Sequence, residues 1–236
     1  MSKLMWDQTG ERTGETGVKQ GVLYPWAAAD KAFTGGVAWN GLTSIAESPT
    51  GAEATPFYAD DQKYLEIMSA EEFAGSIGAF MYPDKFKPCI GEVDLVPGIS
   101  VAQQNREIFG LCYRTTLVND TNGMEYGYKI HLVYNARASV SEADHTTIND
   151  SPELIEFSWE FTTTPVEVPG MKPSAHLIID STKFVTEDAK AKLKAFEDIL
   201  YGTDAGPAPE EGGEPVAATE ARLPMPAEIA ELFAAA

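Results

Sequence analysis

Apolar and polar residues alternate cleanly within Pro152–Thr164, PELIEFSWEFTTT, over a longer stretch than anywhere else in the chain. Side chains of a β-strand point alternately to its two faces, so this pattern predicts one strand with an apolar face and a polar face. The apolar face carries Ile155, Phe157, Trp159 and Phe161, and the polar face carries Glu156, Ser158, Glu160 and Thr162. Burying each of the four apolar side chains contributes roughly 1.5–3 kcal/mol. We therefore expect this strand near the centre of a sheet.

Two further alternating segments predict a long antiparallel hairpin. They are residues 109–117 and residues 126–134. Between them lies Asn122-Gly123, a strong turn signal, because a tight hairpin turn needs positive φ angles that Asn and Gly adopt readily. The two segments should pair along most of their length.

Shorter apolar segments predict additional strands. They are residues 64–68, 73–82, 90–101 and 175–180. The first two are separated only by residues 69–72, a connection short enough for a hairpin. Pro97 and Gly98 interrupt the third, which should be a broken strand or a sheet edge. Residues 48–56, SPTGAEATP, predict a loop.

One convincing helix is predicted at Thr186–Tyr201. Thr186 suits the N-cap position, Glu187 and Asp188 complement the helix dipole in the first turn, and Gly202 follows the last residue. Its apolar stripe consists of Ala189, Leu193, Phe196 and Leu200. A helix with such a stripe should pack on a sheet.

These elements place one β domain at residues 21–202, flanked by segments of different composition. Residues 1–20 are polar and rich in Gly and Thr, which predicts a flexible arm. Residues 203–222 combine Pro, Gly, Ala and Glu with little to bury, which predicts a disordered acidic linker. Residues 223–236 turn apolar again, and a short helix at 227–233 would form a docking surface. On this interpretation, the segment beyond residue 202 is dispensable for folding.

The predicted fold class is mainly β: an antiparallel β-sandwich or barrel-like sheet with one flanking C-terminal helix. A chain of 236 residues that is 44% hydrophobic can bury a sizeable core in one large domain. The candidate core comprises Phe109, Leu111, Tyr128, Ile130, Leu132, Ile155, Phe157, Trp159, Phe161, Leu193 and Phe196.

The chain is strongly acidic, with a formal net charge of −19 from 36 acidic and 17 basic residues. Binding to phosphate backbones needs clustered Lys and Arg, so this balance disfavours nucleic-acid binding. Cys89 and Cys112 match no metal-ligand spacing, and buried free thiols in a protein made in a reducing cytoplasm are the simpler interpretation. The N-terminus lacks the apolar core of a signal peptide, and no stretch approaches the ~18–20 apolar residues of a membrane span. We therefore expect neither export by a standard signal nor a membrane anchor.

Residues that carry chemistry are sparse. The chain has no nucleophile-elbow, P-loop, zinc-protease or paired-cysteine motif, so we expect no enzyme, no cofactor and no metal site. The pairs Asp60-Asp61 and Asp144-His145 are interpreted as solvated loop residues rather than metal ligands. His131 falls on the more polar face of the predicted hairpin, where we expect a surface position.

Several blocks of sequence, taken together, resemble a known family. They are GVLYP at 21–25, WNGLTSIAESPTGAEATPFYADDQKY at 39–64, QQNREIFGLCYRT at 103–115, EYGYKIHLVY at 125–134 and TINDSPELIEFSWEFTTTPV at 147–166. This order of blocks is similar to that of the major tail proteins, or tail tube proteins, of long-tailed bacteriophages with flexible tails. The resemblance runs from about residue 21 to residue 202 and includes no catalytic residues.

The resemblance implies a β-sandwich or barrel-like subunit with a flanking helix that assembles into hexameric rings. Stacked rings would form the virion's tail tube, through which phage DNA passes without specific binding. The implied partners are further copies of the chain and other phage tail proteins. The protein would be made in the host cytoplasm and would not bind a membrane.

An acidic lumen would let DNA slide, because a basic lining would hold the duplex by releasing counterions. The candidate lumen-facing residues are Glu66, Glu156 and Glu160. Equally, these glutamates can be the solvated outside of a sheet. The alternative function is a carbohydrate-binding or decoration β-sandwich module of a surface assembly. Such a module would stay monomeric and bind a glycan, whereas a tube subunit would form rings.

Overall fold

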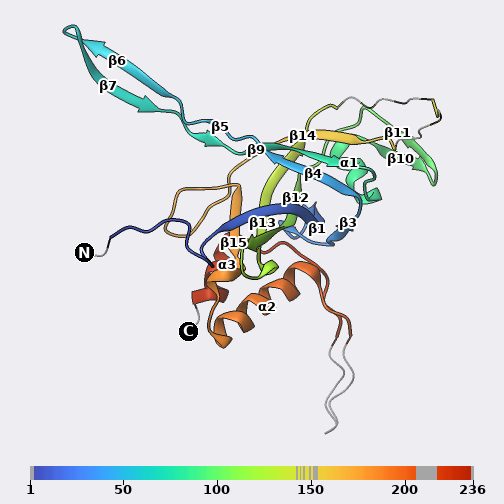
Figure 1. Cartoon of the computed structure of the whole chain (residues 1–236). Coiled ribbons are helices and arrows are strands. Elements are labelled where there is room, and N and C mark those ends of the chain that lie inside the picture. The colour runs from blue at the N-terminus through green and yellow to red at the C-terminus, as the bar shows by residue number, and fades with distance from the viewer. Residues whose placement is uncertain are drawn as a thin grey trace.

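The computed structural model describes residues 3–141, 143, 145, 147–148, 150, 154–205 and 217–234. The strands are β1 (Thr13–Ala27), β2 (Ala32–Phe33), β3 (Val37–Trp39), β4 (Leu42–Glu47), β5 (Thr50–Gly51), β6 (Ala54–Ala59), β7 (Gln62–Met68), β8 (Glu71–Glu72), β9 (Ala74–Ala79), β10 (Val93–Val96), β11 (Ile99–Val101), β12 (Phe109–Asn119), β13 (Gly123–Ala138), β14 (Phe157–Thr163) and β15 (His176–Asp180). The helices are η1 (Asp84–Phe86), α1 (Lys87–Ile90), η2 (Ser181–Lys183), α2 (Glu187–Tyr201) and α3 (Pro226–Ala234). Antiparallel sheets dominate, which confirms the predicted mainly β class (Figure 1).

Nine strands of the described chain form one sheet, whose main path runs β2-β1-β12-β13-β14-β9-β4, with β3 beside β1 and β15 beside β13. The predicted long hairpin is confirmed as β12–β13: Phe109 pairs with Ala136, and Asn119 pairs with Gly123 at the turn. Gly123 has a φ of +58°, which explains why a glycine suits this turn. The short strand predicted at residues 175–180 is β15.

The strand predicted from the alternation at residues 152–164 is β14, and it lies inside the sheet between β13 and β9. It begins at Phe157, later than predicted, and residues 151–153 lie outside the described part of the chain. Trp159 and Phe161 are buried, whereas Glu160 between them is exposed. The alternation therefore predicted the two faces of this strand correctly.

The sheet curls back on itself without closing into a barrel in the described part of the chain. At the end of the path, β4 approaches β1: a Cβ added to Gly21 of β1 would collide with the side chain of Leu42. The inner core fills this curl. Its buried members include Leu23, Trp39, Ile77, Phe86, Phe109, Leu111, Tyr113, Val133, Trp159 and Phe161.

An outer core covers the opposite face of the same strands, beneath α2 and α3. Its buried members include Val22, Tyr24, Phe33, Ile130, Leu132, Tyr134, Leu193, Phe196, Leu200, Leu223 and Ile229. Leu23 and Tyr24 are neighbours in β1 but belong to different cores, because successive side chains of a strand point to opposite faces. Strands β1, β12 and β13 therefore form a middle layer that is buried on both sides.

Most of the candidate core residues are buried, although they divide between the two cores. The buried ones are Phe109, Leu111, Ile130, Leu132, Trp159, Phe161, Leu193 and Phe196. Tyr128, Ile155 and Phe157 are only half-buried. Tyr128 lies at the edge of the outer core, and Phe157 at the edge of the inner core.

The predicted helix is confirmed as α2. Thr186 Oγ1 accepts a hydrogen bond from the N–H of Ala189 (3.2 Å), as expected of an N-cap. Gly202 follows the last residue with a φ of +76°. Leu193, Phe196 and Leu200 are its buried residues, so the helix packs on the outer face of the sheet (Figure 1).

The predicted pairing of residues 64–68 with residues 73–82 is wrong. Strand β7 pairs with β6 in a hairpin of its own, and β9 pairs with β4 and β14. The turn of the β6–β7 hairpin is formed by Asp60 and Asp61, which both have positive φ angles, 50° and 57°. Aspartate tolerates this left-handed conformation, so the turn forms without an Asn-Gly signal. Residues 48–56, predicted as a loop, contain β5 and the start of β6.

The segment predicted as a broken strand or a sheet edge is a small hairpin. Strands β10 and β11 pair with each other, and Pro97-Gly98 connects them. Gly98 has a φ of +88°, which a residue with a side chain rarely adopts. The broken strand is therefore the alternative that the chain forms.

The N-terminal arm is shorter than predicted. Strand β1 begins at Thr13, which pairs with Asn119 of β12, so residues 13–20 extend the sheet. Their side chains are mostly exposed, which explains why a polar composition concealed a strand. Gly10, in the arm itself, donates its N–H to the carboxylate of Asp120 (3.0 Å).

The C-terminal helix docks on its own chain. The prediction that it forms a free docking surface is therefore wrong. Leu223 and Ile229 are buried in the outer core. The hydroxyl of Tyr134 in β13 donates a hydrogen bond to the carbonyl of Pro224 (2.9 Å). The apolar side of α3 is therefore already covered, and this segment stabilises the subunit.

Part of the predicted linker also packs on the body of the molecule. Gly36 donates its N–H to the carbonyl of Ala221 (2.9 Å), and Thr203 and Thr219 form an isolated β-bridge. Residues 206–216 of the predicted linker lie outside the described part of the chain. Two parts of the segment beyond residue 202 therefore complete the outer core and its rim, which argues against the expectation that this segment is dispensable for folding.

We predict that Ile229→Ala lowers the free energy of unfolding by about 2–4 kcal/mol, because it removes most of a buried side chain from the outer core. The exposed Glu231 lies on the same helix, and Glu231→Ala should change stability by less than about 0.5 kcal/mol. Urea unfolding followed by circular dichroism measures both variants. An Ile229→Ala protein as stable as wild type would show that α3 does not belong to the core.

Candidate functional site

The three glutamates predicted to line a lumen do not share one surface. Glu156 and Glu160 are exposed on the polar side of the β14 segment, and Glu156 accepts a hydrogen bond from Thr43 Oγ1. Glu66 lies on β7 and pairs with Lys63 at 2.6 Å. The β6–β7 hairpin that carries Glu66 extends away from the body (Figure 1). The structure therefore groups Glu156 with Glu160 and places Glu66 elsewhere.

The acidic and histidine pairs considered for metal binding are placed differently. Asp60 and Asp61 form the exposed turn of the β6–β7 hairpin. His145 is exposed, and Asp144 lies outside the described residues. Asp60 and Asp61 therefore form the turn between β6 and β7.

The β6–β7 hairpin projects into solvent and carries a large apolar surface (Figure 1). Its exposed residues are Phe57 at 48%, Tyr58 at 71%, Tyr64 at 78%, Leu65 at 49%, Ile67 at 52% and Met68 at 66%. Phe57 pairs with Leu65, and Ile67 follows two residues later, so these three side chains share one face, the hairpin face. An isolated two-stranded hairpin is only marginally stable in water. A partner that covered this face would therefore stabilise the hairpin.

Two other segments expose apolar side chains. The β10–β11 hairpin presents Val93, Leu95, Val96, Ile99 and Val101. The N-terminal arm presents Leu4, Met5 and Trp6, which are 66–75% exposed. Single exposed apolar residues are ordinary, but runs of them on projecting elements mark interaction surfaces.

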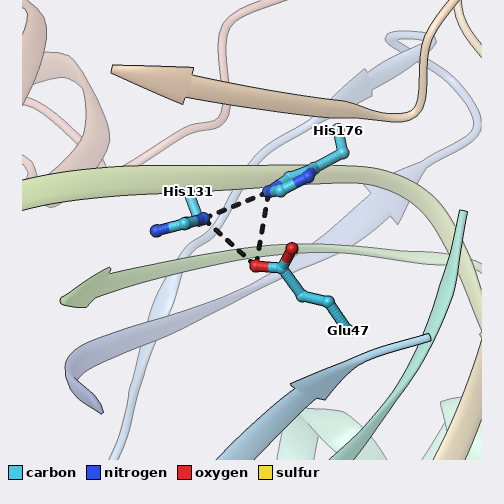
Figure 2. A group of neighbouring side chains, drawn as sticks. All are labelled: Glu47, His131 and His176. Atoms are coloured by element: carbon cyan, nitrogen blue, oxygen red, sulfur yellow. Dashed lines mark hydrogen bonds and ion pairs between the residues drawn. The ribbon is translucent and has the colours of Figure 1, made fainter. Parts of the chain in front are cut away.

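A polar cluster lies at the rim of the inner core, where β4 faces β13 and β15. Figure 2 shows that Glu47 of β4 points toward His131 of β13 and His176 of β15. The His131 Nδ1 atom lies 3.2 Å from His176 Nε2 and 3.3 Å from Glu47 Oε1, and His176 Nε2 lies 3.9 Å from Glu47 Oε1. These are the donor atoms of one compact set that could hold a metal ion.

His131 is buried, with 4% of its surface exposed, so its expected surface position is wrong. The reason is that both faces of β13 are covered, the one by α2 and the other by the curl of the sheet. The ring stacks on Tyr113 of β12 at a centroid distance of 4.6 Å. Its Nε2 atom lies 3.2 Å from Thr115 Oγ1 and 3.4 Å from Glu15 Oε1.

Burial controls the protonation of the two histidines. It lowers the pKa of His131, although Glu47 and Glu15 oppose the shift. It also lowers the pKa of His176 to about 4, again against the influence of Glu47. The Tyr113 hydroxyl donates a hydrogen bond to Glu47 Oε1 (2.6 Å), and burial together with this bond raises the pKa of Tyr113. Both imidazoles are therefore neutral at pH 7.

Sequence reasoning missed this cluster because its members are far apart in the chain. His131 and His176 come together only when β15 pairs with β13, and Glu47 joins them only when the sheet curls. One signal was present: His176 is the first residue of the apolar β15, and His131 lies within the apolar run of β13. Histidines inside two apolar strands indicate burial, but spacing along the chain could not show that the strands are neighbours.

Both cysteines are free and buried, which confirms the interpretation made from sequence. Burial raises the pKa of the Cys89 thiol and of the Cys112 thiol to about 12. The two thiols are therefore protonated at neutral pH and unreactive as nucleophiles. They contribute packing in different cores.

No protein-family model matches the sequence, and no curated protein matches it. A similar solved structure is a chain of the cryo-EM structure of the sheath–tube complex of an extracellular contractile injection system, PVC, in its extended state. The TM-score is 0.35 at 11% sequence identity, and the match covers 68% of this chain and 88% of that chain. A likeness at this level supports no assignment of function, which must come from the chain's own sequence and structure. Among the described residues, no helix is long and apolar enough to cross a membrane.

We predict that the protein loses stability on acidification between pH 6.5 and about 4 and that His176 contributes to the loss. The folded-state pKa of His176 lies below the ordinary value of about 6.5, so the unfolded state binds more protons in this window. The contribution of neutral His176 to stability is fully present above pH 6.5 and is lost as the pH falls toward 4. The contribution should be on the order of 1–2 kcal/mol at pH 5.

Thermal unfolding of the wild type and of His176→Gln at pH 7 and pH 5, in buffer with a chelator, measures this contribution. His176→Gln should lose less stability between the two pH values than the wild type. The exposed His145 offers the matched control, and His145→Gln should keep the wild-type dependence. Equal losses in the wild type and in His176→Gln would contradict the assignment.

Proposed function

We propose that this chain is a structural virion protein that assembles with copies of itself into the tail tube of a bacteriophage. The resemblance of its sequence blocks to tail tube proteins supports the proposal. Its main structural support is the projecting β6–β7 hairpin, whose apolar face is exposed in the single chain. Stacked hexameric rings would be the assembled form, located in the tail and in contact with other phage tail proteins.

The occupant of the hairpin face is a second copy of this chain. Each outer strand edge of the hairpin carries backbone groups that pair neither with the other strand nor with the nine-stranded sheet of the described chain. Such edges invite pairing with another chain. In a symmetric assembly every subunit presents the same hairpin to the same acceptor surface, so all copies are covered at once. A soluble monomer would leave this surface in water.

The arm and the β10–β11 hairpin fit the same interpretation. Both are peripheral segments with apolar side chains in solvent, namely Trp6 at 75% exposed in the arm and Leu95 at 70% exposed in β10. A ring subunit needs contacts within its ring as well as contacts between rings. Three separate apolar segments supply enough surface for more than one kind of contact.

DNA passage is the function that we assign to the tube. The net charge of −19 disfavours binding of a duplex, so DNA would slide through an acidic lumen without being held. The exposed Glu156 and Glu160 are the candidates for this lining, whereas Glu66 lies apart from them on the projecting hairpin. Salt at physiological concentration screens repulsion beyond about 8–10 Å, so the effect needs many symmetric copies.

A carbohydrate-binding or decoration module is the second candidate. It is favoured by Tyr58 and Tyr64, two aromatic side chains that are 71% and 78% exposed on the same hairpin. Exposed tyrosine rings can stack on sugars. The two functions differ in a property that is simple to measure, because a module of this kind stays monomeric whereas a tube subunit self-associates.

We predict that the concentrated wild-type protein forms rings or tubes and that the double variant Leu65→Glu/Ile67→Glu stays monomeric. The substitutions place two charges on the hairpin face and remove nothing from either core, so the thermal unfolding temperature should stay the same. Negative-stain electron microscopy and light scattering on the same samples give the answer.

The matched control is Glu66→Gln, which changes the residue between the two substituted positions on the opposite face of β7. This variant should assemble like the wild type. A wild-type protein that remains monomeric at high concentration, even when seeded with tail tips, would argue against the tube. Glycan-array binding by that monomer would then favour the carbohydrate-binding module.

We also predict that virions carrying Glu156→Lys and Glu160→Lys form normal tails but eject DNA more slowly. Lysines in the lumen would bind the phosphate backbone, and the delay should grow as the salt concentration falls. Ejection can be followed by the fluorescence of a DNA dye after receptor addition. Normal ejection at low salt would remove this face from the lumen while leaving the tube proposal intact.

A further inference from the structure

The side chains of Glu47, His131 and His176 leave one atom of each directed at the same small space. Figure 2 shows the three groups converging from β4, β13 and β15. The atoms are Glu47 Oε1, His131 Nδ1 and His176 Nε2, separated by 3.2, 3.3 and 3.9 Å. Donor atoms bound to one tetrahedral Zn²⁺ at about 2.0–2.1 Å lie roughly 3.3 Å apart. Two of the three separations match this spacing, and the third, between His176 Nε2 and Glu47 Oε1, is longer at 3.9 Å, a gap that a small movement of the half-exposed Glu47 side chain closes.

Both ring nitrogens of His131 lie close to carboxylates. Its Nδ1 faces the carboxylate of Glu47 at 3.3 Å, and its Nε2 faces the carboxylate of Glu15 at 3.4 Å. A neutral imidazole carries only one N–H, so when Nε2 carries it, toward Glu15 Oε1, the Nδ1 lone pair faces His176 Nε2 and the Glu47 carboxylate. In that tautomer a divalent cation between His131 Nδ1, His176 Nε2 and Glu47 Oε1 would make three attractive contacts.

From these contacts we propose that Glu47, His131 and His176 form a Zn²⁺ site. Imidazole nitrogen with carboxylate oxygen suits zinc better than Mg²⁺ or Ca²⁺, which prefer oxygen alone. Water occupies the fourth position. The ion is structural: it ties β4, at the end of the curled sheet, to β13 and β15 across the inner core.

Surrounding groups hold the ligands in the orientation that zinc requires. With Nδ1 on the metal, the His131 Nε2–H points at Glu15 Oε1 and Thr115 Oγ1, the carboxylate partner that metal-bound histidines usually have. The Tyr113 hydroxyl donates to Glu47 Oε1 and fixes the carboxylate. His176 stacks on Phe73 at a centroid distance of 4.3 Å. The ligands are thus positioned before an ion arrives.

An ion can reach the site from the surface. A surface pocket lined by residues that include Phe73, Ser174 and His176 reaches one of the three ligands, His176. Glu47 keeps 37% of its side chain exposed, so one ligand is accessible to water. Entry therefore requires no unfolding of the inner core.

The test is direct binding of Zn²⁺ to the full-length chain after removal of metals with a chelator. We expect one Zn²⁺ per chain by isothermal titration and by elemental analysis. Saturating Zn²⁺ should raise the unfolding temperature by at least about 5 °C. Equimolar Mg²⁺ should raise the unfolding temperature far less, because Mg²⁺ prefers oxygen ligands and two of the three ligands are nitrogens. Cobalt substituted for zinc should give the visible absorption of a tetrahedral ion.

Single-ligand variants assign the site. Glu47→Gln and His176→Gln are close in size to the native residues and should weaken Zn²⁺ affinity at least roughly tenfold. His145→Gln replaces an exposed histidine and should bind Zn²⁺ like the wild type. A wild-type chain that binds no Zn²⁺, or binding that survives both ligand substitutions, would overturn the proposal. Neither result depends on ring formation, because both are measured on the free subunit.

Discussion

The burial of β1, β12 and β13 on both faces is the constraint on which the rest of this structure depends. Leu23 and Tyr24 are adjacent in β1, yet each fills a different core. Because both faces of these strands carry apolar side chains, each face needs another part of the chain packed against it. The curl of the sheet supplies the inner cover, while α2 and the returning C-terminal segment supply the outer one. The helices are therefore required to bury the outer apolar face of this middle layer.

Local sequence signals correctly predicted the elements that are determined by neighbouring residues. The alternation around Trp159, the Asn122-Gly123 turn and the Thr186 cap each specify one element, and each element forms. The errors came where long-range pairing decides the outcome. Residues 64–68 could pair on either side by pattern alone, and the Asp60-Asp61 turn selected β6. The polar strand at residues 13–20 formed because a long β12 was available to it.

The two functional features differ in how far sequence could reveal them. The apolar residues of β7 were visible in the sequence, but their exposure was not, because it depends on the hairpin leaving the body. The histidine cluster required both a strand pairing and the curl of the sheet. His131 looked like a surface residue because a two-faced strand was interpreted as a one-faced one. Candidate sites built from distant strands thus become apparent only with the tertiary structure.

The bridge between Thr203 and Thr219 has a consequence for how the chain tolerates change. The two residues are hydrogen-bonded to each other, so the two ends of the connection between α2 and α3 are held together on the surface. Doubling the length of such a loop costs only about 0.6 kcal/mol in closure entropy. This position is suited to carrying an inserted peptide or reporter while α2 and α3 keep their places.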